Sequence, residues 1–279
     1  MEPSNEQVCR AAAASRVDIP RLTEGVPMSD ADPDGLGIGP VAVQVLDRAS
    51  AVDITVQAVQ ARAPRIVAFA NAHTINVARR MPEFASALQR AIVLNDGAGI
   101  DLASWVLTGR TFPDNLNGTD LTPLVLDQLE PGTGVFLVGS PPGVAEKAAE
   151  AIQRAHPHIR IAGTQHGFFA AGDEIELAER IRRSGCGLVL AGMGNPRQEL
   201  WAAANIDRIG APVMCVGALL DFYAGVVPRA PAMVRRLRLE WGFRLCQEPR
   251  RMARRYLVGN VTFLLYIFAL WRQRETSQG

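Results

Sequence analysis

Short apolar runs alternate with amphipathic stretches along most of the chain, starting near Val41. Six of the runs are almost continuously apolar: Arg65–Ala70, Ala91–Asn95, Gly134–Gly139, His158–Gly163, Gly187–Gly192 and Pro212–Gly217. Four stretches between them have the spacing of helices: Ala98–Leu107, Thr119–Leu129, Val144–Ala155 and Glu174–Arg183. Continuously apolar strands that are each followed by a helix are typical of a parallel sheet covered on both faces. The pattern therefore predicts a Rossmann-like, doubly wound α/β catalytic domain over residues 39–228.

Both ends of the chain differ from this central pattern. Residues 1–38 are rich in Ala, Asp, Pro and Gly without periodicity, which predicts a flexible leader. Residues 229–279 are compatible with helix, and they include an apolar run of 15 residues, Leu257–Trp271. A bilayer-spanning helix needs about 20 apolar residues, so this run is too short to cross a membrane. We expect an arginine-rich membrane-associating appendage that lies in the interface. The alternative is a core helix of the domain with solvated arginines.

The charges are distributed unevenly. The net charge is +1, but eleven Arg and two Glu lie between Arg229 and Arg274, so this stretch carries +9 and the remainder −8. Such an asymmetry indicates an anionic surface or substrate near the C-terminal end. A nucleic-acid partner is the other explanation of a basic stretch. The long apolar run and the presence of a single Lys favour an anionic membrane surface, and we expect no nucleic acid.

Cysteine usage and the first residues indicate the compartment. The four cysteines are far apart and lack C-x-x-C spacing: Cys9, Cys186, Cys215 and Cys246. A disulfide framework or a zinc site is therefore disfavoured. The sequence does not start with a basic segment followed by an apolar one, so we expect no export. These observations predict a cytoplasmic protein with no metal and no other cofactor.

Candidate chemistry lies where the predicted strands end, because ligands of doubly wound sheets bind beyond the carboxyl ends of the strands. After the first two runs, the candidate substrate-binding residues are Asn71, His73 and Thr74, then Asp96, Gly97 and Gly99. A carboxylate beside glycines can approach a ligand closely, since glycine adds no bulk and tolerates unusual φ. Asp96 is therefore a candidate general base or sugar-hydroxyl ligand. The structural alternative is that its Asp-Gly pair only forms a turn.

The later strand ends supply further candidates. The segment Gly139–Gly143 links a run to a helix and can cradle a phosphate or hold a nucleoside. It lacks the G-x-G-x-x-G fingerprint, so a dinucleotide-dependent oxidoreductase is the weaker alternative. Glu199 lies in the first turn of a helix that starts at Pro196, where the helix dipole alone also explains an acid. The candidate substrate-binding residues here are Gly139, Ser140, Gln165, His166, Gly192, Gly194, Asn195, Gln198, Glu199 and Asp221. His156 and His158 flank Pro157 in a turn, and we interpret them as surface residues.

These segments together resemble the WecG/TagA/CpsF family of bacterial glycosyltransferases. The resemblance covers about residues 40–260 and is most specific in the Gly-x-Gly-x-Pro-x-Gln-Glu block and the Glu-Trp…Gln-Glu-Pro-Arg-Arg tail. The matching pieces are Asn71–Asn76, Asn95–Gly99, Gly139–Gly143, Gly163–Gly167, Gly192–Trp201, Gly217–Gly225 and Arg229–Arg251. One departure is the Phe69-Ala70 pair before Asn71, where relatives often carry Thr, which puts that hydroxyl contact in doubt unless Thr74 substitutes.

The resemblance implies an inverting, metal-independent transfer from a UDP-sugar to a polyprenyl-diphosphate-linked saccharide at the inner face of the membrane. Asp96 then corresponds to the proposed catalytic base, and Gln198 lies by the nucleotide-sugar pocket. The products of such enzymes feed teichoic acid linkage units, enterobacterial common antigen or exopolysaccharides. The donor sugar stays open among N-acetylmannosamine, its uronic acid, glucose and galactose. Oligomeric state stays open as well, with a homo-oligomer as one option.

A departing diphosphate needs neutralisation, and guanidinium groups are the cations available without a metal. The arginines nearest in sequence to the last strand-end loop are the first candidates to bind this group: Arg229, Arg235, Arg236 and Arg238. The alternative for each of them is contact with anionic lipid. A hexuronate donor needs one further cation, for which Arg197 is a candidate.

Overall fold

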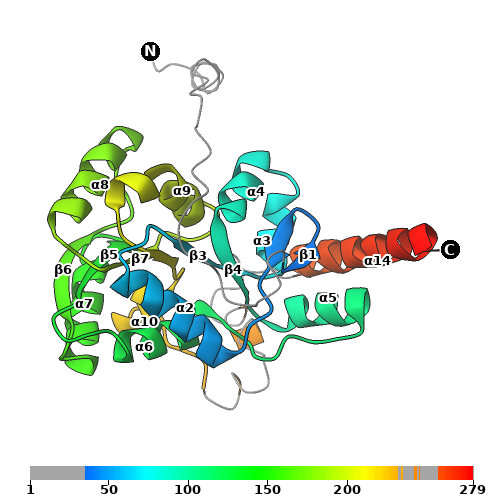
Figure 1. The fold of residues 1–279 in the computed structure, drawn as a ribbon, viewed down its shortest axis with the longest axis horizontal. Helices are drawn as coiled ribbons and strands as arrows, with labels where there is room; N and C mark the ends of the chain where they lie inside the picture. Colours follow the sequence, from blue (N-terminus) through cyan, green and yellow to red (C-terminus); the bar gives the residue numbers. More distant parts are fainter. Residues whose placement is uncertain (1–34, 232–233, 235–241, 244, 246–256, 279) are drawn as a thin grey trace. The chain divides into compact units, whose positions relative to one another are not determined.

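A six-stranded parallel sheet forms the centre of the computed structural model, which describes residues 35–231, 234, 242–243, 245 and 257–278 (Figure 1). The strand order is β4-β3-β8-β7-β5-β6. The strands are β3 (Ile66–Ala70), β4 (Ala91–Asn95), β5 (Gly134–Gly139), β6 (Arg160–Gln165), β7 (Leu188–Gly192) and β8 (Val213–Cys215). The predicted fold class, a Rossmann-like parallel sheet flanked by helices, is confirmed.

Helices cover both faces of the sheet, and successive residues of a strand point into opposite layers. In β3, Ile66 and Ala68 belong to one hydrophobic cluster, whereas Val67 and Phe69 belong to the other. The first cluster includes side chains of α4 (Pro82–Gln89), α8 (Glu174–Arg183) and α9 (Arg197–Ile209). The second includes side chains of α2 (Arg48–Gln60), α6 (Gly118–Asp127), α7 (Val144–Ala155) and α10 (Leu219–Tyr223). Burial on both faces explains why these strands are continuously apolar.

Most predicted strand and helix bounds agree with the structure within one or two residues. The largest difference is β6, which begins and ends two residues later than the predicted run His158–Gly163. This strand lies at the edge of the sheet and pairs only with β5, with a register shift between Val135 and Phe136. Its residues are only partly buried, so apolar character marks its ends poorly.

Several short elements were not predicted from the hydrophobic pattern. An antiparallel hairpin, β1 (Leu36–Ile38) and β2 (Val41–Val43), precedes α2, and β1 falls within the range assigned to the leader. Helix α5 (Ala98–Thr108), which follows β4, agrees with the predicted stretch Ala98–Leu107 to within one residue. Helix α3 (Ala72–Ala78) follows β3, and a 3-10 turn, Ala171–Asp173, precedes α8; neither was predicted. These elements have few residues, which leaves too few periods for a pattern to identify them.

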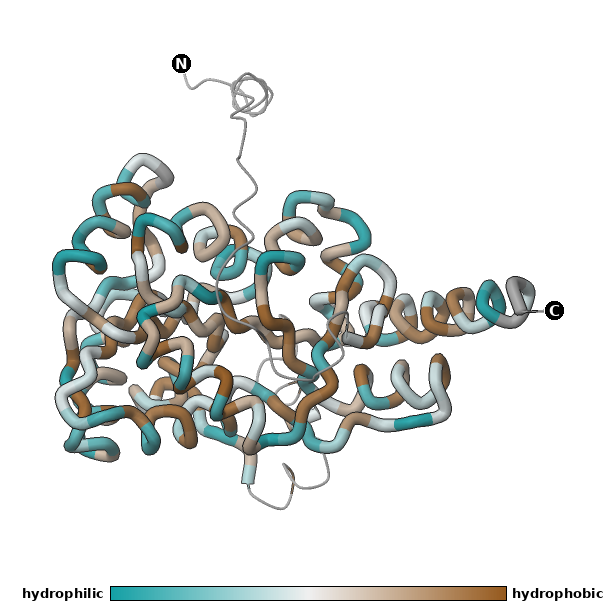
Figure 2. Tube along the Cα trace, in the orientation of Figure 1, coloured by the Kyte–Doolittle hydropathy of each residue, from teal (hydrophilic) through white to brown (hydrophobic). Residues whose placement is uncertain are grey.

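The C-terminal helix α14 (Gly259–Gln278) is apolar along much of its length (Figure 2). It packs against α3 and α5, and its Phe263 and Ile267 are only 1% and 2% exposed. On the other side, Leu265 and Phe268 are 67% and 54% exposed. Among the described residues, no helix has the length and hydropathy that a bilayer span requires. The helix therefore combines a core-facing side with an apolar side that the described residues leave uncovered.

The interpretation of His156 as a surface residue is wrong. Its side chain is buried, and Nδ1 lies 2.8 Å from Oδ1 of Asp127, while Nε2 lies 3.5 Å from the Tyr223 hydroxyl. His158 is half-buried, with Nε2 3.0 Å from the Leu126 carbonyl oxygen. The end of α7 packs between α6 and α10, a long-range contact that a local turn pattern does not reveal. Burial also raises the pKa of Tyr223, and the nearby Asp127 raises it further.

Candidate functional site

The first two strand-end constellations meet at the carboxyl edge of the sheet. Because β3 and β4 are parallel neighbours with Ala70 opposite Asn95, the next residues, Asn71 and Asp96, are also opposite each other. The Asn71 side-chain Nδ2 donates to Oδ2 of Asp96 at 3.2 Å. The Asp96 backbone N–H donates to the Ala70 carbonyl at 2.8 Å, which continues the ladder by one residue. The structure thus fixes a half-buried carboxylate at this edge.

Asn71 also begins helix α3. Its Oδ1 accepts hydrogen bonds from the backbone N–H groups of His73 and Thr74 at 3.1 and 3.2 Å. In return, the Thr74 hydroxyl accepts from the Asn71 backbone N–H at 3.2 Å, which completes a capping box. The cap leaves the amide nitrogen of Asn71 to face Asp96. The Thr74 side chain is buried, and its hydroxyl serves the start of the helix.

The Asp-Gly pair of the second constellation is a strand-to-helix turn that also presents its carboxylate. Gly97 has φ +89°, a conformation that disfavours residues with a Cβ, and its N–H donates to Oδ1 of Asn115 at 2.8 Å. Asn95 is fully buried, and its Nδ2 donates to the Asp114 carbonyl at 2.7 Å. The loop after α5 therefore clamps Asp96 by holding the residues before and after it, Asn95 and Gly97. The turn and the functional interpretation of this pair are compatible.

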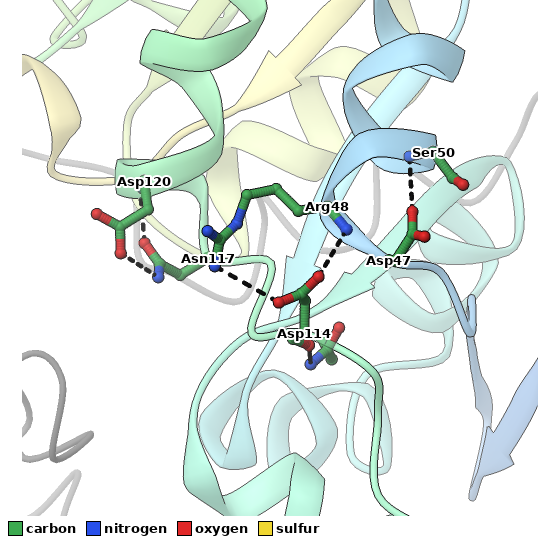
Figure 3. Close-up of polar contacts among 7 residues, drawn as sticks. Asp47, Arg48, Ser50, Asp114, Asn117 and Asp120 are labelled. Carbon is green, nitrogen blue, oxygen red and sulfur yellow. Dashed lines mark hydrogen bonds and ion pairs between the residues drawn. The ribbon is translucent and has the colours of Figure 1, made fainter.

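A second polar group adjoins this loop, at the start of α6 (Figure 3). Asn117 caps the helix by accepting from the Asp120 N–H at 2.9 Å, and its Nδ2 donates to Oδ2 of Asp120 at 2.8 Å. Asp114 pairs with Arg48 at 3.6 Å and accepts from the Arg48 backbone N–H at 3.0 Å. The residues of this group were missed in the sequence, although N-x-x-D before an apolar run is a recognisable start of a helix.

Arg229 joins the group at α6. Its guanidinium donates to Oδ1 of Asp120 and forms an ion pair with it, while its buried Nε has no hydrogen-bond partner among the described residues. The other three candidate arginines, Arg235, Arg236 and Arg238, lie outside the described residues. The structure therefore locates one of the four proposed cations.

The ends of β5 and β7 approach each other without room for side chains. The Ser140 N–H donates to the Gly192 carbonyl at 3.0 Å, and the Gly167 N–H donates to the Ser140 carbonyl at 2.8 Å. A Cβ on Gly139 would lie 2.3 Å from the Gly192 oxygen. Ser140 has φ +57°, an uncommon conformation for a residue other than glycine, and is only 7% exposed. Within the part of the chain that the structure describes, its hydroxyl has no hydrogen-bond partner, which is costly for a buried polar group unless a ligand supplies one.

Gln198 is buried and uses its whole amide within the protein. Its Oε1 accepts from the N–H groups of Gly194 and Gly217, both at 3.1 Å. Its Nε2 donates to Oε1 of Glu199 at 2.8 Å and to the Cys215 carbonyl at 3.1 Å. Gln198 thus ties the loop after β7 to the loop after β8. Burial, and secondarily the charge of Glu199, raises the pKa of the Cys215 thiol well above its usual range.

The remaining candidates occupy the same edge with fewer mutual contacts. Both amide atoms of Asn195 are buried with no hydrogen-bond partner in the described ranges, and the peptide bond to Pro196 is cis. Gln165 accepts from the Arg180 guanidinium, and Nδ1 of His166 accepts from the Phe168 N–H at 3.2 Å. The Arg197 guanidinium lies 5.1 Å from the centre of the Phe169 ring and donates a hydrogen bond to the backbone carbonyl of Phe169. Asp221 is half-buried on α10.

Three of the predicted groups are joined by hydrogen bonds in the structure. They are the pair Asn71 and Asp96, the turn of Ser140 against Gly192, and the clamp of Gln198 on Gly194 and Gly217. Among the described residues, no three His, Cys, Asp or Glu side chains are arranged to hold a metal ion. Among the described residues, the groups at this edge include the oriented Asp96 carboxylate, the unpartnered Ser140 hydroxyl and the unpartnered Asn195 amide.

A parallel sheet with these groups at its carboxyl edge defines a Rossmann-like α/β enzyme with a ligand site at the strand ends. The model of the glycosyl transferase WecG/TagA/CpsF family matches residues 36–277, and the chain belongs to this family. The chain is thus a glycosyltransferase, and the family implies a sugar-nucleotide donor and a glycoconjugate acceptor.

Proposed function

We propose that the chain is an inverting, metal-independent hexosyltransferase that moves a sugar from a UDP-sugar to a polyprenyl-diphosphate-linked saccharide in cell-surface or exopolysaccharide biosynthesis. The observation that carries the proposal is the Asp96 carboxylate, oriented by Asn71 at the carboxyl edge of the sheet. Inversion takes one displacement step. The acceptor oxygen bonds to the anomeric carbon, its proton passes to Asp96, and the bond from that carbon to the UDP oxygen breaks on the opposite face.

The donor seat is supported by the two unpartnered polar side chains. The Ser140 hydroxyl and the Asn195 amide are buried without hydrogen bonds to any residue that the structure describes, and both follow strands at the carboxyl edge. A nucleotide supplies donors and acceptors for both groups and removes the cost of leaving them unpaired. Three glycines near these groups have no side chains that would occupy the space for the nucleotide: Gly139, Gly192 and Gly194.

Neutralisation of the leaving diphosphate is assigned to tail arginines. Arg229 is held by Asp120 at the start of α6, next to the loop that clamps Asp96. An arginine that is already placed by an ion pair keeps further N–H groups for phosphate oxygens, because the guanidinium has five donors. We propose that three further arginines add positive charge around the leaving diphosphate: Arg235, Arg236 and Arg238.

We also propose that the protein works as a peripheral protein on the cytoplasmic face of the membrane. The support is the exposed apolar side of α14 together with the +9 charge between Arg229 and Arg274. Apolar side chains flanked by arginines suit an interface that contains anionic headgroups.

The direct test is a panel of UDP-sugars with a short-chain polyprenyl-diphosphate-linked acceptor, followed by mass spectrometry and NMR of the products. We expect a single hexose transferred with inverted anomeric configuration, at an unchanged rate in excess EDTA. Retention of configuration would contradict the mechanism, and loss of activity in EDTA would contradict metal independence. No transfer from any UDP-sugar would contradict the donor class.

A further inference from the structure

Helix α14 lies against the two helices that follow the candidate catalytic pair. Helix α3 starts directly after Asn71, and α5 starts two residues after Asp96. Helix α14 contacts both of them and runs beside them away from the sheet (Figure 1). Its buried side therefore faces the elements that carry the site, while its exposed apolar side faces away from them.

Helix α14 contacts the first turns of α3 and α5 through Phe263. A Cβ on Gly99 would lie 3.5 Å from Cβ of Ala72 and 3.6 Å from the Phe263 ring. Gly99 is thus the point where the first turns of both helices meet Phe263, with space for one methyl group in ordinary contact. One turn further along α3, the Asn76 side chain donates to the Gly259 carbonyl at 2.7 Å.

Further contacts fix α14 along its length. The Arg79 guanidinium lies 3.5 Å from the centre of the Tyr266 ring, a cation–π contact. A Cβ on Gly39 would lie 2.2 Å from the Tyr266 hydroxyl, so the turn between β1 and β2 packs closely against α14 at this position. Arg274 donates to the carbonyls of Leu107 and Gly37 at 3.2 and 3.3 Å. The position of Phe263 is therefore set by the whole helix rather than by one side chain.

We propose that α14 positions the catalytic carboxylate: Phe263, seated on Gly99, holds the first turns of α3 and α5 so that Asn71 and Asp96 keep their hydrogen bond. The inference rests on the proposed function in that it takes Asp96 as the base. Gly99 then acts through Phe263 rather than by touching substrate. A base must lie within hydrogen-bond reach of the proton that it removes, so a small shift of either helix lowers the turnover rate. The same rigid helix presents Leu265 and Phe268 outward, so membrane attachment and base placement depend on one element.

Size exchange at the Gly99–Phe263 contact tests the proposal. The variants are Phe263→Ala, Gly99→Val and the double variant with both changes, with Val261→Ala, on the exposed side of α14, as the matched control. Kinetics are measured on the full chain with a water-soluble acceptor, so that vesicle binding does not contribute. Donor KM, UDP affinity and thermal unfolding are measured in parallel.

We expect kcat to fall about tenfold or more in Phe263→Ala and Gly99→Val, with donor KM and UDP affinity within about twofold of the parent. Val261→Ala should keep its kcat, and the double variant should recover part of the loss because the added methyl groups occupy the space that the ring vacates. An unchanged kcat in folded Phe263→Ala overturns the proposal. A parallel loss of kcat, UDP affinity and stability without recovery in the double variant overturns it as well.

A double-mutant cycle with Asp96→Asn separates this inference from the proposed function. If α14 acts through Asp96, Phe263→Ala should lower the residual kcat of Asp96→Asn by less than twofold. A further tenfold loss of kcat in the Asp96→Asn background contradicts the positioning role of Phe263 but leaves the assignment of Asp96 as the base intact. Full activity of Asp96→Asn itself contradicts the assignment of the base, whatever Phe263→Ala does.

Discussion

Asp96 is positioned by backbone and amide contacts from three directions. The Asp96 backbone N–H donates to the Ala70 carbonyl, and the Asp96 carboxylate accepts from the Asn71 side-chain amide. The next residue, Gly97, donates its N–H to the Asn115 side chain. A carboxylate that accepts an amide hydrogen bond has a fixed orientation, which general-base catalysis requires. Its neighbours also explain why an Asp-Gly turn can carry chemistry here.

Replacement of Asp96 tests the base directly. Asp96→Asn should lower kcat by about 100-fold or more, because the amide cannot accept the acceptor proton, whereas UDP affinity should stay within about twofold. Steady-state kinetics and calorimetry measure the two quantities. Asp207→Asn, on the exposed side of α9, is the matched control and should retain full activity. A fully active Asp96→Asn would remove Asp96 from the mechanism.

Gln198 has a structural role that the family resemblance did not indicate. Its four hydrogen bonds are all to protein groups, so its amide holds two strand-end loops in place. The prediction that it lies by the nucleotide-sugar pocket stays a prediction. Contact with the donor would then pass through Gly194 and Gly217, the loop residues that it holds.

Truncation of this side chain should cost both stability and donor affinity. Gln198→Ala leaves buried N–H and C=O groups unpaired, so we expect the free energy of unfolding to fall by about 2–4 kcal/mol. Donor KM should rise as the loops loosen. Chemical denaturation and kinetics measure these effects. Arg208→Ala, exposed on the same helix, should change stability by no more than about 0.5 kcal/mol. A stable Gln198→Ala with a normal KM would show that the loops do not need this clamp.

At the scale of elements, α14 has two sides with different environments. Phe263 and Ile267 are part of the hydrophobic core, so the core-helix interpretation holds for one side of the helix. Membrane contact of the exposed side stays a prediction. Deletion of residues 229–279 would remove the core side together with the exposed one. Point substitutions on the exposed side are therefore the more specific way to test membrane binding.

The double variant Leu265→Gln/Phe268→Gln should bind vesicles that contain anionic phospholipid at least about tenfold more weakly, because two apolar side chains no longer enter the interface. Its melting temperature should not change, since both side chains are more than half exposed. Sedimentation with vesicles measures the binding. Ile175→Gln, which alters an equally exposed residue on α8, should bind as the parent does. Equal vesicle binding by all three proteins would contradict docking through α14.

At the scale of the molecule, the charge asymmetry and the sheet edge are proposed to serve different substrates. The stretch from Arg229 to Arg274 carries +9, and its one located site arginine, Arg229, is beside the loop that clamps Asp96. We propose that this arrangement brings a lipid-linked acceptor with a diphosphate group and a nucleotide donor to the same edge. The family establishes glycosyl transfer, whereas the identity of the acceptor depends on this proposal.

Nucleotide preference discriminates between the proposed donor and the oxidoreductase alternative. UDP should raise the melting temperature by several degrees at saturating concentration, because a ligand that binds only the folded state stabilises it. NAD should leave the melting temperature unchanged, since the turn Gly139–Gly143 lacks the dinucleotide fingerprint. A thermal-shift measurement with both nucleotides checks this. Stabilisation by NAD and not by UDP would favour the alternative.

The sequence was sufficient for the fold class and for most strand and helix bounds. A strand covered on both faces must be apolar throughout, and the consecutive residues of β3, β5 and β7 meet this requirement. It was also sufficient to place Asn71, Asp96 and Ser140 at strand ends. Such local patterns report that a residue is buried or that a strand stops, because these depend on neighbours in the chain.

The partners of those residues depended on the folded structure. Local patterns do not report that β8 lies between β3 and β7, that Asn115 reaches Gly97, or that His156 is buried against Asp127. The same holds for the seat of Phe263 on Gly99, which joins residues more than 160 positions apart. Apolar character predicts burial but not the surface that provides it. Which strands are neighbours, which side of α14 is covered and which groups meet Asp96 were therefore decided by packing across the whole domain.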